Sequence, residues 1–137
     1  MKKTLLIFLA LFSMSCASES YYKNGKLVEL QNIDSSKYVN DSSTKHSKSN
    51  VSIKYYKTME GKKVGVTNQL LVKCKALVNC PTFLDTFNLS NYSKLSDTIF
   101  LVTINNRNNI FSLSKALFES TMVDFAHPNF VKERRKR

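Results

Sequence analysis

The fold is decided by residues 69–130, QLLVKCKALVNCPTFLDTFNLSNYSKLSDTIFLVTINNRNNIFSLSKALFESTMVDFAHPNF. Its first part, Gln69–Lys75, alternates side chains so that Leu70, Val72 and Cys74 share one face, which predicts a strand. A helix of about two turns is expected next, because Pro81 suits a first helical turn. Its apolar stripe consists of Phe83, Leu84 and Phe87.

The second half of this stretch predicts two more strands, a helix and a final strand. Tyr92–Leu95 is a short strand candidate, and Thr98–Ile104 is a stronger one because it is rich in β-branched and aromatic residues. After a polar Asn-rich turn, residues 110–120 predict an amphipathic helix. Met122–Ala126 predicts the last strand, which we expect Pro128 to end.

The resulting order is β-α-β-β-α-β. This order is typical of a ferredoxin-like α+β domain, with two helices on one face of a four-stranded antiparallel sheet. We place this domain at residues 51–130, followed by a basic tail at 131–137.

Hairpin strands and a linker are expected before this domain. Residues 18–33 predict a short hairpin, because Asn24-Gly25 suits a tight two-residue turn. Residues 55–66 repeat the pattern around Gly61. Between the hairpins, residues 34–50 contain six Ser among 17 residues and predict a flexible linker. His46 lies in this linker, which argues against a catalytic role for it.

Composition excludes several classes of protein. The chain has 137 residues, 42% of them hydrophobic, a net charge of +11 and three Cys. This length leaves no room for a large hydrolase domain, and the chain has only one extended apolar run, so a polytopic membrane protein is excluded. Three Cys cannot build a scaffold of several disulfides.

The N-terminus, residues 1–17, has the pattern of an export signal. Lys2 and Lys3 precede an apolar run of about nine residues, followed by small residues. Cleavage after Ala17 fits the small-residue rule, whereas Cys16 could instead be lipidated. Without Lys2 and Lys3, 19 basic residues face 10 acidic ones, a net charge of +9. We therefore expect a protein that is periplasmic, secreted or attached to the envelope.

Two thiols remain after the export signal, Cys74 and Cys80. In an oxidising compartment they could form a disulfide that closes a short loop, or they could stay free. A metal site is not expected, because the chain has only two His and neither is near this pair. No cofactor is expected either.

The segment Met122–Phe130 resembles the final strand of the propeptides of subtilisin-like (S8) serine proteases, especially the fervidolysin-like ones. These propeptides commonly end in a Val, an aromatic two residues later, then Ala-Glu-Pro-Asn and another aromatic; here His127 stands where the family usually has Glu. The resemblance covers about residues 52–132. It implies a prodomain that acts as folding chaperone and inhibitor of a protease catalytic domain, which would be the partner.

The resemblance also implies how such a prodomain binds. Its sheet packs on the catalytic domain, and its C-terminal tail lies extended in the active-site cleft. The tail residues here would be Pro128, Asn129, Phe130, Val131 and Lys132. Phe130 is either a pocket anchor or a core aromatic. We expect no enzymatic activity, because the family's catalytic triad belongs to a domain that this sequence does not contain.

The basic tail and Cys16 leave other functions open. The tail could be a cleavable linker or could be attracted to an anionic membrane surface, whereas nucleic acid is not an expected partner of an exported protein. Membrane attachment would otherwise depend on a lipid on Cys16. The chain could be a separate inhibitor or the remnant of a truncated protease. From another class, it could be a small basic envelope lipoprotein or surface binding module.

Overall fold

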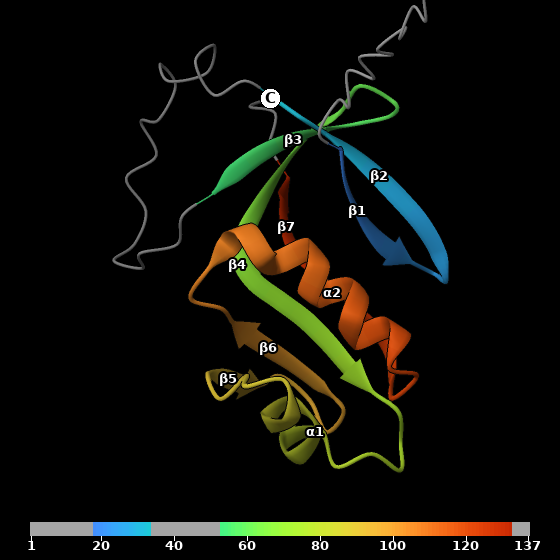
Figure 1. The fold of residues 1–137 in the computed structure, drawn as a ribbon, viewed down its shortest axis with the longest axis vertical. Coiled ribbons are helices and arrows are strands. Elements are labelled where there is room, and N and C mark those ends of the chain that lie inside the picture. The colour runs from blue at the N-terminus through green and yellow to red at the C-terminus, as the bar shows by residue number, and fades with distance from the viewer. Residues whose placement is uncertain (1–17, 34–52, 133–137) are drawn as a thin grey trace, which may run out of the picture.

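The computed structural model describes residues 18–33 and 53–132 (Figure 1). The expected export signal with Cys16, the Ser-rich linker with His46 and the last residues of the basic tail lie outside the described residues.

The described chain is α+β, as the sequence predicts. A single sheet of seven strands carries two α-helices and one short 3-10 helix. The elements are β1 (Ser18–Lys23), β2 (Lys26–Asn32), β3 (Lys54–Thr58), β4 (Lys63–Cys74), α1 (Cys80–Thr86), β5 (Tyr92–Lys94), β6 (Ile99–Thr103), η2 (Arg107–Asn109), α2 (Ile110–Glu119) and β7 (Val123–Lys132).

The strand β4 organises the sheet. Hydrogen-bonded neighbours follow the order β1-β2-β3-β4-β6-β5, and β7 pairs with β4 as well. Residues 63–66 of β4 pair with β3, residues 69–73 pair with β6, and β7 pairs with both halves. Each of these pairings is antiparallel. The long strand β4 is therefore hydrogen-bonded to three others, β3, β6 and β7.

The two expected hairpins are present. Asn24 and Gly25 have φ angles of 51° and 72°, the left-handed values that a tight β-hairpin turn requires. Gly61 has φ 82° in the turn between β3 and β4. The prediction of two separate elements, a hairpin at 55–66 and a strand at Gln69–Lys75, was wrong. The single strand β4 runs from Lys63 to Cys74 and so includes residues of both.

The expectation that Pro128 ends the last strand is also wrong, because β7 continues to Lys132. The register of β4 and β7 shifts between the pairs Val66–Phe130 and Leu70–Pro128, which leaves extra β4 residues opposite Asn129, next to the proline. An irregularity of this kind tolerates a residue that has no N–H to donate. Pro128 is buried there.

The two helices form as their sequences predict. Asn79 caps α1, since its side-chain oxygen accepts a hydrogen bond from the N–H of Thr82 at 3.2 Å. Pro81 lies in the first turn. The apolar face of α2 buries Ile110, Phe111, Ser114 and Leu117, in agreement with the amphipathic pattern.

The sheet curves so that its first strand meets its last one. The rings of Tyr21 on β1 and Phe130 on β7 are 4.8 Å apart, although these strands share no hydrogen-bonded pairing. The helix α2 contacts both strands, and Figure 1 shows it beside β1 and β4. Its Phe111 ring meets Tyr56 of β3 edge to face at 5.2 Å. The inner face of the curved sheet and the helices thus share one core.

Candidate binding surfaces

The segment Pro128–Lys132, which the resemblance to protease propeptides implies as the protease-binding tail, is part of the sheet. Val131 and Phe130 are paired with Gly65 and Val66 of β4. Phe130 is partly exposed and packs against the core beside Tyr21. The segment therefore builds the domain, and its exposed end consists of Val131 and Lys132.

Asn129 fixes this segment to the irregular part of β4. Its backbone carbonyl accepts a hydrogen bond from the hydroxyl of Thr67 at 3.2 Å. Its side-chain amide donates to the side-chain oxygen of Gln69 at 3.3 Å. These bonds replace ladder hydrogen bonds that the proline and the register shift interrupt.

One face of the sheet is apolar and lies away from the helices. We call it the outer face and define it by Leu71, Lys73, Ile99, Leu101, Phe125 and His127, all of them partly exposed. Leu71 is opposite Leu101 on β6 and His127 on β7. Because side chains alternate along a strand, these residues lie on the other face of the sheet from the buried Leu70 and Val72.

Both helices lie on the other side of the sheet. The α1 residue Cys80 is bonded to Cys74, whose side chain shares the inner face with Val72. The α2 residue Phe111 contacts Tyr56, which is also buried in the core. The helices of the described chain therefore leave the outer face uncovered.

Aromatic stacking and one ion pair organise the outer face. The rings of Phe125 and His127 stack 5.0 Å apart. Next to them, the Lys73 ammonium is 3.6 Å from the Asp124 carboxylate, and both side chains are substantially exposed. An ion pair this exposed contributes little stability, so it serves mainly to set the charge pattern at the margin of the apolar area.

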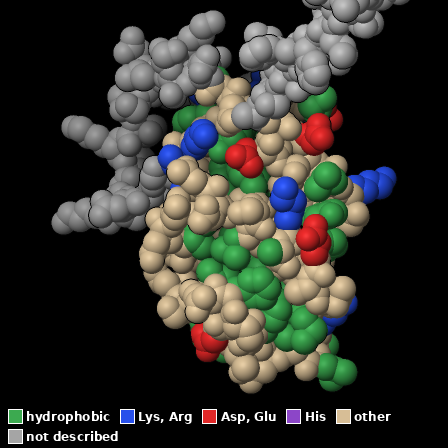
Figure 2. Space-filling view, viewed as in Figure 1, with side chains coloured by type: hydrophobic (Ala, Val, Ile, Leu, Met, Phe, Trp, Pro, Cys, Tyr) green, Lys and Arg blue, Asp and Glu red, His purple; other side chains and the backbone are tan. Residues whose placement is uncertain are grey.

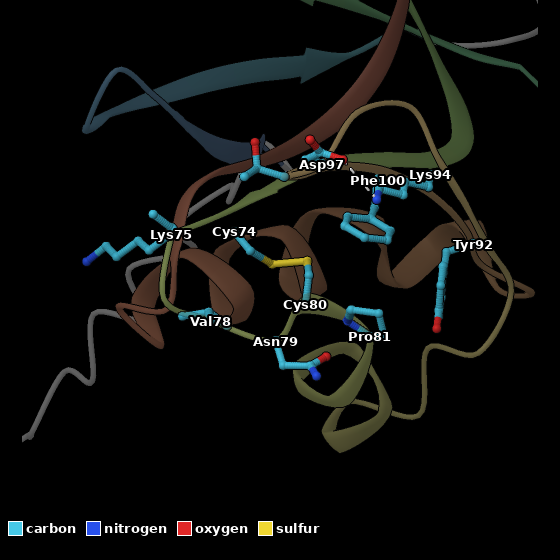
Figure 3. Close-up of a pocket in the computed structure, with 12 residues that line it drawn as sticks. Cys74, Lys75, Val78, Asn79, Cys80, Pro81, Tyr92, Lys94, Asp97 and Phe100 are labelled. Atoms are coloured by element: carbon cyan, nitrogen blue, oxygen red, sulfur yellow. Dashed lines mark ion pairs between the residues drawn. A yellow bond between two sulfur atoms is a disulfide. The ribbon is translucent and has the colours of Figure 1, made fainter.

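The structure joins Cys74 to Cys80 in a disulfide, with Cα atoms 5.8 Å apart. It links the end of β4 to the start of α1 and forms part of the wall of a hollow of about 400 Å³. Figure 3 shows Phe100 and Tyr92 to one side of the disulfide and Lys75 and Val78 to the other. Two bonded sulfurs are not available as metal ligands.

Exposed apolar side chains surround this end of the sheet. Leu77 is 101% exposed, Leu95 56% and Met122 45%, each in a different loop. Two hydrogen bonds connect these loops to the end of β4: the N–H of Lys75 donates to the carbonyl of Met122 at 3.1 Å, and the N–H of Cys74 donates to the carbonyl of Thr98 at 3.0 Å. Figure 2 shows a continuous area of hydrophobic side chains across the lower half of its view, with most of the visible charges above it or at its margins.

Sequence reasoning missed the outer face as a surface. The alternation of Leu71 with Val72 was visible, but nothing local says which residues of β6 and β7 lie beside it.

No protein-family model, no curated protein and no solved structure matches the chain. Among the described residues, no helix is long and apolar enough to cross a membrane, and no three potential ligand side chains are grouped for a metal ion.

Proposed function

We propose that the chain is an exported, non-catalytic binding protein of the subtilisin-prodomain type. Its outer face would pack against the catalytic domain of a subtilisin-like serine protease. The exposed end of β7 would lead the following residues toward the active-site cleft. The protein would then act as a folding chaperone and inhibitor of that protease.

The order of strand pairing supports the fold that this proposal needs. The pairs β7–β4, β4–β6 and β6–β5 give the neighbour order β7-β4-β6-β5, and the chain order from β4 onward is β-α-β-β-α-β. This order agrees with the one expected of a split βαβ unit. We therefore propose that residues from Lys63 to Lys132 form a ferredoxin-like unit, to which β1–β3 are added.

The outer face is the single observation that carries the proposal. Its centre consists of Leu71 and Leu101, which are directly opposite each other, with the Phe125–His127 stack on the neighbouring strand. Apolar and aromatic side chains at the centre of a flat surface, with polar groups at its margin, are typical of protein interfaces. A prodomain that docks through its sheet requires such a face free of helices.

The disulfide supports the location that is proposed. A Cys74–Cys80 bond persists in the periplasm or outside the cell, whereas cytosolic thiols are kept reduced. This agrees with the export signal expected at residues 1–17.

The experiment is inhibition of a purified subtilisin by the full chain, purified with its native N-terminus. We expect slow, reversible inhibition of peptide hydrolysis and no peptidase activity of the chain itself. Leu71→Asp should raise the inhibition constant at least tenfold, equivalent to about 1.4 kcal/mol, because it places a charge at the interface centre. Thermal unfolding of the variant would verify that the sheet is intact.

The matched control is Leu27→Asp. Leu27 is also a leucine on a strand, but it is 52% exposed, lies on β2 and is outside the outer face. Its replacement should leave inhibition unchanged. Equal effects of the two substitutions would exclude docking through the outer face, and absence of inhibition at micromolar concentration would reject the prodomain function for this protease class.

A further inference from the structure

A second hollow lies at the opposite part of the sheet and shares no residue with the outer face. It is a cleft of about 410 Å³ between the β1–β2 hairpin, the β3–β4 turn and the end of β7. We call it the hairpin cleft. Its apolar wall consists of Tyr21, Val28, Leu30, Val64 and Phe130, and Met59 lies at its margin.

The curvature of the sheet creates this cleft. Tyr21 and Phe130 touch at 4.8 Å, whereas β1 and β7 are not joined by a hydrogen-bonded ladder. The inner faces of β2 and β4 beside them therefore border a space that no residue of either helix lines. Apolar hollows at the mouth of a curved sheet are common binding sites for small ligands, and this volume lies within their usual range.

Two cations stand at the mouth of the cleft. Lys23 and Lys132 line it and follow Tyr21 and Phe130 by two residues, so each shares a strand face with the aromatic ring. The successive antiparallel pairings make β1 and β7 run in the same direction. Both lysines therefore lie beyond the touching rings at the same end of the cleft.

Charge at the mouth favours an anion. Glu60 and Lys62 also line the cleft and are paired with each other at 3.0 Å. The pKa of the Glu60 carboxyl is lowered mainly by Lys62 and to a smaller extent by Lys23. Within the described part of the chain, neither Lys23 nor Lys132 forms an ion pair of its own, so the cleft carries more positive than negative charge at its mouth. Glu29 also borders the cleft, but it alternates with Val28 and Leu30 and so belongs to the other face of β2.

We infer that the hairpin cleft binds a small amphipathic anion, such as a medium-chain fatty acid. The apolar chain would lie against Val28, Val64 and Phe130, which removes its surface from water. The carboxylate would lie between the ammonium groups of Lys23 and Lys132 and form charge-assisted hydrogen bonds with them.

The test is titration of the full purified chain with decanoate, followed by calorimetry, at concentrations below those at which the ligand forms micelles. We expect saturable binding with one site, and at least tenfold weaker binding of decanol, which has the same apolar chain without the charge. Lys23→Gln and Lys132→Gln should each weaken decanoate binding several-fold. Both positions are exposed, so folding should not be affected.

The matched control is Lys94→Gln, an exposed lysine that lines the other hollow. Its replacement should leave decanoate binding unchanged. The inference is wrong if decanoate does not bind, if decanol binds equally well, or if the Lys94 variant loses as much affinity as the cleft variants. Sedimentation with anionic vesicles but no binding of monomeric decanoate would indicate adsorption to a membrane surface instead and would also overturn it.

Discussion

Replacement of Ser114 by Ala tests how α2 is attached to β7. Ser114 is fully buried on α2, and its hydroxyl donates a 2.7 Å hydrogen bond to the backbone carbonyl of Ala126. The loss of such a bond costs about 1 kcal/mol, and the carbonyl that loses a partner in the core adds on the order of 1 kcal/mol. The better helix propensity of Ala returns roughly 0.5 kcal/mol. We expect a net loss of about 1–2 kcal/mol in the free energy of unfolding.

Ser112→Ala is the matched control for this prediction. Ser112 is also on α2, and its hydroxyl donates to the carbonyl of Asn109 at 2.9 Å, but it is exposed. Water replaces this bond, so the change should be neutral or slightly stabilising. Urea unfolding followed by circular dichroism measures both variants, with an unchanged denaturant slope as evidence of the same unfolding reaction. Equal destabilisation by the two substitutions would refute burial as the cause.

Two further predictions concern the disulfide and the buried tyrosines. Cys74 and Cys80 should resist alkylation in denaturant until reduced, and Cys80→Ser should lower the unfolding free energy by about 2 kcal/mol, as expected for so short a loop; full labelling without reductant would exclude the bond. Burial raises the pKa of Tyr21 and Tyr56 above the ordinary 10.0, and Glu19 raises that of Tyr56 further. Their contribution to stability should be fully present below about pH 10 and lost as pH rises through the folded-state pKa values. Tyrosinate absorbance and urea unfolding at several alkaline pH values measure this, and a stability that stays constant through that range would contradict it.

Local patterns predicted the elements from Cys80 onward well, because helices and short strands are encoded by neighbouring residues. Alternation identified the buried Leu70 and Val72, and periodicity identified the buried face of α2. Pairing between distant strands has no such local signal. The sequence was interpreted as two elements, one ending at residue 66 and one beginning at residue 69, but β4 is continuous there and only its register with β7 shifts. This register shift allows β7 to continue past Pro128.

The difference between local patterns and contacts of distant segments also explains what the sequence predicted of the candidate sites. The sequence singled out Phe130 and Pro128, but it did not indicate that Phe130 would contact Tyr21 from the first hairpin. It offered no sign of the hairpin cleft, because Val28, Val64 and Phe130 come from three separate segments. Sites that arise from sheet curvature depend on tertiary contacts that a linear pattern does not contain.

The contact between Tyr21 and Phe130 has a consequence for the order of folding. The strands β1 and β7, at the two ends of the described chain, are in contact. The strand β4, between them in sequence, pairs with β7 along most of its length. Closing such distant contacts is slow, because the loop entropy is lost before most of the sheet forms. A chain emerging from its N-terminus cannot complete this sheet until residue 132 is available. We therefore expect this sheet to be completed later in synthesis than a fold built from local contacts.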